Sequence, residues 1–382
     1  MMKHQIMYLL LSGLTLCGLT ACQDDNTFDK DEMAYSIYIT YSEGSAAVTG
    51  DIEGLVTVSG ADVTVNDPAS NRALTLVLSG SVSDGSLLVY REKKFTIQLN
   101  GVSITNSDGP AINNQCGKAL YVVCADGTTN TLADGTAYAA QSFDQKGALF
   151  SEGQIYFSGS GTLNVRGNCK NAIACDDYIT IYDGVVINAT TSSNGTNGIK
   201  ANDGMYIYGG TLTVDVQSAG GRGIKCDSVV VINGGTTTIT TSGDCVYDEE
   251  EDDYSSAACV KCDRPFIMTG GTLTMTSTGD GGKGLNCAED IVFSGGTLTA
   301  TTTGTNNDAK PKAVKGDGIT ILGGSFFAKV SKSWACDNGT DSDEPAAHVT
   351  VSGTPSATAT VTVDGETYTS PYYSKKVMYI AY

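Results

Sequence analysis

The sequence predicts an all-β protein whose chain winds into a single-stranded parallel β-helix with coils of about 25 residues. Three observations support this class. A Gly-Gly pair or its equivalent recurs along the chain, and a short motif such as Gly198-Ile199-Lys200 precedes each pair at a nearly constant distance. Threonine and apolar residues alternate in short runs, as in half-buried strands. The 382 residues are enough to bury a large core.

The repeat is measured from the closing glycine of each pair and from the apolar residue of each motif, which we call the marker residue. The glycines are Gly161, Gly184, Gly210, Gly235, Gly271, Gly296 and Gly324. The marker residues are Leu149, Ile173, Ile199, Ile224, Val260, Leu285 and Val314. Since 10 to 12 residues separate each marker from its glycine, length varies only in the other half of the coil. Coils without helices stack at the interstrand spacing of about 4.8 Å.

Alternation within each coil assigns side chains to the inside or the outside of the solenoid. Apolar residues five and three positions before the closing glycine, such as Met205 and Ile207, are expected to point inward. The outward positions carry threonine: Thr211, Thr213, Thr236, Thr238, Thr272, Thr274, Thr297 and Thr299. The coil from Gly184 to Asn188 does not follow this register.

A cysteine column follows each marker residue by two positions and is expected to face inward. It contains Cys175, Ala201, Cys226, Cys262, Cys287 and Gly316. Exported chains usually oxidise their cysteines, but thiols stacked in one column point the same way. We therefore favour buried, reduced thiols that pack as small apolar groups. A disulfide between Cys245 and Cys259, which flank an insertion at residues 247–256, is left open.

Two charged rows are expected to lie outside, one and three positions after the marker residue. The first row contains Lys200, Lys225, Lys261 and Lys315. The second row and its neighbouring corners contain Asp176, Asp177, Asn202, Asp203, Asp227, Asp244, Asp263 and Asp280. One interpretation is that the lysine row and the aspartate row neutralise each other, because like charges stacked about 5 Å apart within one row repel. The other is that the second row binds calcium, which prefers oxygen ligands. If the protein is a lyase, Lys200, Lys225 and Lys261 are the candidate bases.

Tyrosines suggest a sugar-binding surface. Tyr182 and Tyr208 fall in one outward column on adjacent coils, and Tyr206 lies nearby. Aromatic faces on a flat sheet stack on sugar rings, and Lys200 and Lys225 are expected to add polar contacts to the carbohydrate. The alternative is ordinary strand preference, since tyrosine favours strands.

The N-terminus predicts export and a lipid anchor. Lys3 and His4 precede an apolar run, and Leu19-Thr20-Ala21-Cys22 is similar to a lipobox. We expect residues 1–21 to be a signal peptide and Cys22 to be lipidated; the alternative is an ordinary signal peptide. The residues 23–26 that follow resemble the acidic export signal of bacterial surface lipoproteins. We therefore expect the protein to lie on the outer membrane, anchored by lipid and facing outward.

The charge balance excludes one class of partner. With 23 basic and 42 acidic residues, the formal net charge is −19. Such a chain repels nucleic acid, because phosphate binding needs a basic surface.

Four motifs in order identify a family. They are LNGVSITNSDGPAI (99–112), GTTNTLADGTAY (127–138), KGALFSEGQIYFSGSGTLNVRG (146–167) and KNAIACDDYITI (170–181). The region 63–330 resembles the bacterial carbohydrate-binding β-helix proteins once classed as a domain of unknown function, which are similar in fold to polysaccharide lyases. The resemblance implies a right-handed parallel β-helix, bound calcium and binding of plant cell-wall polysaccharide, including acidic pectin-type chains. The family's Asp before Gly-Ile-Lys is replaced at Asn171, Asn197 and Arg222, so fewer ions are expected.

The expected organisation is a signal peptide (1–21), an N-terminal linker with capping strands (22–60), the β-helix (61–330) and a C-terminal β cap (331–382). Residues 361–368 read as a hairpin with Asp364-Gly365 at its tip. The expected function is non-catalytic, calcium-supported polysaccharide binding by a monomer. The alternatives are a calcium-dependent polysaccharide lyase and a surface adhesin that needs no glycan.

Overall fold

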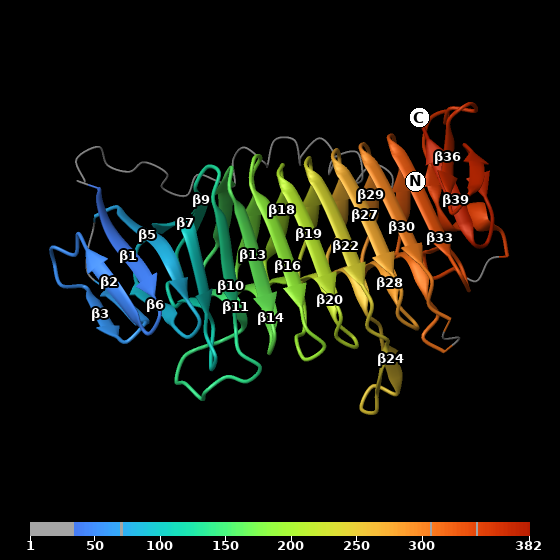
Figure 1. The fold of residues 1–382 in the computed structure, drawn as a ribbon. Coiled ribbons are helices and arrows are strands. Elements are labelled where there is room, and N and C mark those ends of the chain that lie inside the picture. Colours follow the sequence, from blue (N-terminus) through green and yellow to red (C-terminus); the bar gives the residue numbers. More distant parts are fainter. Residues whose placement is uncertain (1–33, 69–71, 306–307, 341–342) are drawn as a thin grey trace.

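The computed structural model describes residues 34–68, 72–305, 308–340 and 343–382 as an elongated stack of β-coils (Figure 1). The strands lie side by side from the blue N-terminal end to the red C-terminal end, and equivalent strands of successive coils pair in parallel. The structure confirms the all-β class and the parallel β-helix, and the right-handedness of the helix stays a prediction. In the part of the chain that the structure describes, no helix is long and apolar enough to cross a membrane.

One face of the solenoid, which we call the lysine sheet, has 12 strands within the described residues. They are β3 (Val56–Ser59), β4 (Asp62–Asp67), β6 (Ser86–Arg91), β8 (Ile112–Asn114), β11 (Gly147–Ser151), β14 (Asn171–Cys175), β17 (Ile199–Ala201), β20 (Arg222–Cys226), β25 (Ala258–Cys262), β28 (Lys283–Cys287), β31 (Lys312–Lys315) and β34 (Cys336–Asp337). The pairings are parallel from β4 onward, whereas β3 pairs antiparallel with β4.

Two further columns of strands complete the coils. The first, the tyrosine face, contains β9 (Leu120–Cys124), β12 (Ile155–Gly159), β15 (Tyr178–Ile181), β18 (Gly204–Ile207), β21 (Val230–Ile232), β26 (Phe266–Met268), β29 (Ile291–Phe293), β32 (Ile319–Ile321) and β35 (Thr350–Val351). The second, the threonine face, contains β10 (Thr129–Ala133), β13 (Thr162–Gly167), β16 (Val186–Thr191), β19 (Thr211–Val216), β22 (Thr236–Thr241), β27 (Thr272–Ser277), β30 (Thr297–Thr302) and β33 (Ser325–Val330). They meet at β7 (Phe95–Thr105), which pairs with both β9 and β10.

Both ends of the solenoid carry additional strands. At the N-terminal end, β1 (Tyr35–Ser42) pairs in parallel with β5 (Leu74–Val82) and antiparallel with β2 (Ser45–Thr49). At the C-terminal end, β39 (Val377–Ala381) pairs antiparallel with β33 and with β38 (Tyr372–Tyr373). A short 3-10 helix (Pro345–His348) precedes β35. The predicted hairpin is confirmed as β36 (Thr360–Val363) and β37 (Glu366–Thr369), with positive φ at Asp364 and Gly365 in its turn.

The marker residues form one continuous interior column. Ile199 pairs with Ile224, Ile224 with Val260, and Val260 with Leu285 across neighbouring strands of the lysine sheet. All four side chains are fully buried. The inward and outward positions expected from alternation are therefore confirmed, because each coil repeats the choices of its neighbour.

The coil at Gly184 has a specific reason for its shifted register. Gly184 and Gly210 both have positive φ, yet Val186 pairs with Thr211. One additional residue, Val185, therefore stands between the corner glycine and the strand. Its side chain is fully buried at the corner, so the insertion adds to the core.

The cysteine column is buried and in register, as predicted. Cys226 pairs with Cys262, and Cys262 with Cys287. Cys259 is a free, fully buried thiol beside Thr241, so the Cys245–Cys259 disulfide left open above is not formed. The insertion instead forms a projecting hairpin of β23 (Val246–Asp248) and β24 (Asp253–Ser255) (Figure 1).

The predicted signal peptide and Cys22 lie outside the described residues.

Candidate functional site

Aromatic rings on the tyrosine face form a surface over β9, β12, β15 and β18, which we call the tyrosine ladder. Its members are Tyr121, Tyr156, Tyr178, Tyr182, Tyr206 and Tyr208. Four rings are nearly parallel: centroids lie 5.1 Å apart for Tyr121–Tyr156, 6.3 Å for Tyr156–Tyr182 and 6.0 Å for Tyr182–Tyr208. Coil stacking brings these rings together: Tyr121 pairs in register with Tyr156, and Tyr182 and Tyr208 occupy equivalent positions of the next two coils. The residue in register with Tyr156 is Thr180, so the row shifts by two residues between Tyr156 and Tyr182.

The remaining two rings pack edge-on beside one ring of the row, Tyr156. Tyr178 lies perpendicular to Tyr156 at 5.7 Å, and Tyr206 lies perpendicular to Tyr178 at 5.9 Å. The hydroxyls of Tyr156 and Tyr178 are hydrogen-bonded to each other. Tyr182 and Tyr208 remain 42% and 48% exposed. Edge-to-face and offset contacts are favourable for aromatic rings, so the ladder forms a fixed, partly exposed apolar surface.

Sequence reasoning found only Tyr182, Tyr206 and Tyr208. Counting back from Gly161 would turn Tyr156 inward, but the positive-φ corner of this coil is Gly159. Ile155 and Phe157 are therefore the buried residues, and Tyr156 lies between them on the outside. The alternation of Ile155, Tyr156 and Phe157 was the signal that locates this ring.

Lys200 and Lys225, predicted to contact carbohydrate or act as bases, are neutralised by the acidic row. Lys200 Nζ lies 2.8 Å from Asp227 Oδ2, and Lys225 forms an ion pair with the same carboxylate. Burial by itself raises the pKa of Asp227, but the hydrogen bonds from both lysines outweigh it and hold the pKa below its usual value. The neutralising interpretation therefore describes these residues.

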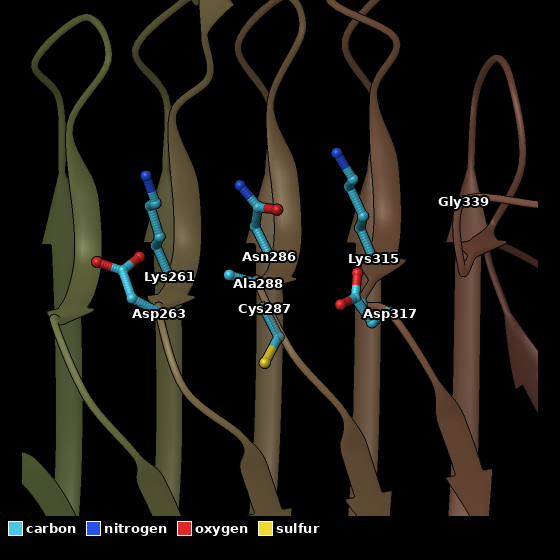
Figure 2. Close-up of a pocket in the computed structure, with 9 residues that line it drawn as sticks. Lys261, Asp263, Asn286, Cys287, Ala288, Lys315, Asp317 and Gly339 are labelled. Atoms are coloured by element: carbon cyan, nitrogen blue, oxygen red, sulfur yellow. The ribbon is translucent and has the colours of Figure 1, made fainter.

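Lys261 differs from its two neighbours in the row. Within the described residues it pairs with no carboxylate, and burial, followed by the charge of Arg222, lowers its pKa. Lys261 lines a hollow of about 320 Å³ on the lysine sheet (Figure 2). The other lining residues are Asp263, Asn286, Cys287, Ala288, Lys315, Gly316, Asp317 and Gly339.

Of the residues predicted to bind calcium, the structure brings Asp176 into an acidic cluster. Its carboxylate lies with those of Asp144 and Glu152 in a group whose oxygens are all within 4.8 Å of one another, the one such group among the described residues. Burial, and then the charge of Asp176, raises the pKa of Glu152. Sequence reasoning missed Asp144 and Glu152, because neither lies in a repeated row.

Lys146 already occupies part of this acidic cluster. It pairs with Asp176 and lies 2.6 Å from Asp144 Oδ2. The oxygen donors fit calcium, which prefers six to eight oxygen ligands. The ammonium group, however, supplies a positive charge at the same place, so an ion would bind beside or instead of it.

The other predicted calcium ligands are dispersed. Asp244 Oδ1 accepts the amide of Asp280 at 2.7 Å, and Asp280 Oδ1 accepts the amide of Thr305 at 2.7 Å. These carboxylates therefore stabilise turns of successive coils. Asn202 donates to Asp176 at 3.5 Å, and Asp177 accepts the amide of Tyr178. Asp203 is exposed, and Asp263 lies 3.9 Å from Lys225.

Comparison with known proteins assigns the family. A model of the carbohydrate-binding domain-containing protein family matches residues 59–251 and 213–309, more than half of the chain. A solved structure described as the polysaccharide lyase-like protein from C. thermocellum, gadolinium derivative, is 17% identical with a TM-score of 0.42, and the match covers 83% of this chain and 97% of that chain. No curated protein matches. The chain belongs to the carbohydrate-binding domain-containing protein family.

Proposed function

We propose that this protein binds polysaccharide without cleaving it, along the tyrosine ladder. The observation that carries the proposal is the row of rings over four successive coils. Centroid separations near 6 Å exceed the contact thickness of two carbon surfaces, about 3.5–4.0 Å, so the rings do not cover one another fully. The uncovered ring surface suits the C–H faces of sugars, and the family membership supports carbohydrate as the ligand.

The ladder favours a chain ligand over a single sugar. Its rings extend along the stacking direction, so one linear glycan running that way contacts several rings at once. Weak contacts to successive sugars then add to the affinity, because the loss of translational and rotational entropy on binding occurs once for the whole chain, as in any multivalent interaction. Part of the surface is held in place before a ligand arrives, because Tyr178 packs edge-on against Tyr156 and Tyr206 packs edge-on against Tyr178.

The test is removal of the two most exposed rings. We expect Tyr182→Ala combined with Tyr208→Ala to weaken binding of a glycan selected on an array by about tenfold or more, since a stacked ring contributes about 0.5–1.5 kcal/mol. Isothermal titration measures the affinity. Tyr247→Ala is the matched control, because Tyr247 is 46% exposed but lies on the β23–β24 hairpin. Equal affinities for wild type and double variant would refute the ladder as the binding surface.

Calcium belongs to the proposal as structural support. Asp144, Glu152 and Asp176 would hold the ion, which would relieve repulsion among their carboxylates. Calcium is then expected to raise the melting temperature of the wild type and not of Asp176→Asn. A melting temperature that is the same with calcium and with chelator would remove the ion from the proposal.

Export to the outer membrane through a lipid on Cys22 is also proposed, on the basis of the N-terminal sequence. The expected result is detergent-phase partitioning of the full chain that is lost in Cys22→Ser. Pectin-type polysaccharide is the first ligand to test, because the motif resemblance implies it.

A polysaccharide lyase is the second candidate, favoured by the state of Lys261. Its lowered pKa and missing carboxylate partner suit a base, whereas Lys200 and Lys225 are ion-paired. Incubation with polygalacturonate and calcium, followed by the absorbance of unsaturated products, separates a lyase from a binding protein. Failure to bind any glycan would favour the adhesin alternative.

A further inference from the structure

The two charged rows of the lysine sheet follow a pairing rule between coils. The lysine of one coil approaches the aspartate of the next: Lys200 lies 2.8 Å from Asp227, and Lys225 lies 3.9 Å from Asp263. The register explains the rule, because Lys200 pairs with Lys225 and Lys225 with Lys261 across neighbouring strands. Each ammonium group is thereby placed beside the corner of the following coil.

The rule fails at the next two lysines of the row, Lys261 and Lys315, which lie on either side of the coil of Asn286. The residue of the next coil that corresponds to Asp263 is Ala288 for Lys261. For Lys315, paired in register with Asp337, the corresponding residue is Gly339. Both replacements line the hollow described above. Lys261 and Lys315 therefore lack the next-coil carboxylate that Lys200 and Lys225 approach. Within the described residues, neither forms an ion pair with the aspartate of its own coil either, whereas Lys225 pairs with Asp227 of its own coil.

The coil of β28, which carries Ala288, also leaves space for the hollow. Between the two lysines the row carries the shorter Asn286, in register with Lys261 on one side and Lys315 on the other. Figure 2 shows Lys261, Asn286 and Lys315 in one line, pointing the same way, with Ala288 below them. The volume of about 320 Å³ is roughly ten times the share of one water molecule, about 30 Å³, so a group larger than a simple inorganic anion fits.

The donors and acceptors in the hollow define the ligand class. Two ammonium groups and an amide can donate to an oxyanion, and Asp263 and Asp317 can accept hydrogen bonds from hydroxyls. A sugar that carries one anionic group and several hydroxyls satisfies both sets, whereas a neutral sugar offers hydroxyl acceptors but brings no negative charge to the ammonium groups.

We propose that this hollow is a subsite for one anionic sugar residue, whose carboxylate or sulfate group binds Lys261, Asn286 and Lys315. The inference rests on the proposed polysaccharide-binding function and names the residues that select charged glycans. Lys200 and Lys225, which the sequence nominated, are not the selecting residues, because Asp227 already neutralises them.

The decisive variant introduces a carboxylate at Ala288, where the two coils before it carry aspartate. Ala288 is exposed, so Ala288→Asp introduces a partner for Lys261 without disturbing the core. Titration of the full mature chain uses three probes: an oligogalacturonate, its methyl ester and a sulfated oligosaccharide. We expect Ala288→Asp, and separately Lys261→Gln combined with Lys315→Gln, to weaken binding of the charged probes about tenfold and to leave the methyl ester unchanged. Lys225→Gln, a paired lysine, is the control with unchanged selectivity.

The outcomes separate this subsite from the tyrosine ladder. Loss of the ladder rings weakens charged and esterified probes alike, whereas Ala288→Asp affects the charged probes alone. A preference for oligogalacturonate identifies a carboxylate, and a preference for the sulfated probe identifies a sulfate ester. Equal wild-type affinity for oligogalacturonate and its methyl ester, or unchanged binding of both charged probes by Ala288→Asp, overturns the proposal. Melting temperatures of all variants establish that each is folded.

Discussion

At the scale of single residues, the interior columns show how strictly stacking controls side-chain chemistry. Thr237 occupies the inward column between Leu212 and Leu273 and is fully buried. Its hydroxyl has no hydrogen-bond partner among the residues that the structure describes, whereas Thr238 beside it faces outward. A buried hydroxyl without a partner costs free energy of folding.

We expect Thr237→Val to raise the free energy of unfolding by about 1 kcal/mol, because valine has nearly the same shape and no polar group to desolvate. Denaturant unfolding measures the change. Thr238→Val, at an exposed position of the same strand, should stay within about 0.5 kcal/mol of wild type. A destabilised Thr237→Val would show that the hydroxyl has a partner in solution.

At the scale of elements, the corners between strands set the register of each coil. Gly271 adopts a φ of 77°, and a Cβ there would lie 2.6 Å from the backbone of Gly234 in the preceding coil. Close approach of successive corners thus requires glycine for both conformation and space. Gly365, in the hairpin turn, has a similar φ of 79° but no neighbouring atom within 4 Å.

These two glycines separate backbone strain from steric overlap. Gly365→Ala should lose about 1 kcal/mol of stability through the positive φ alone. Gly271→Ala should lose a further 1–3 kcal/mol, roughly, because the preceding coil must move away. Thermal or denaturant unfolding compares them, and equal losses would mean that the coils adjust without cost.

At the scale of the whole molecule, buried thiols in several coils make the stability of the solenoid depend on pH. Burial raises the pKa of Cys124, Cys175 and Cys259 to about 12 and that of Cys226 to about 11. An unfolded thiol titrates near pH 8.5. Between these values the folded chain keeps protons that the unfolded chain loses, so stability is complete below about pH 8.5 and falls as the pH rises toward 12.

We therefore expect stability to decrease above about pH 8.5, by up to about 1.4 kcal/mol per pH unit for each buried thiol. Cys175→Ala combined with Cys226→Ala should reduce this slope. Ala201 lies between them in the same column, so alanine already fits there. Denaturant unfolding at pH 7 and pH 10 measures the slope, and an unchanged slope in the double variant would show that other groups dominate.

The sequence by itself determined the solenoid and the identity of its columns. Equal spacing between marker residues and corner glycines requires the coils to stack in register, and stacking turns a sequence period into a line of like side chains. The interior cysteines and the outward threonines were predictable for that reason. So was the hairpin at Asp364-Gly365, because its turn depends on local backbone preference.

Only the tertiary structure decided which outward residues are available to a ligand. One additional residue at a corner moves a whole strand by one position, and for this reason Tyr156 was missed. Ion pairs join residues of different coils, so sequence spacing did not reveal that Lys200 is neutralised while Lys261 is not. A repeat fixes the direction of each side chain. Whether that side chain is ion-paired, and what it contacts, depends on the neighbours that stacking brings beside it.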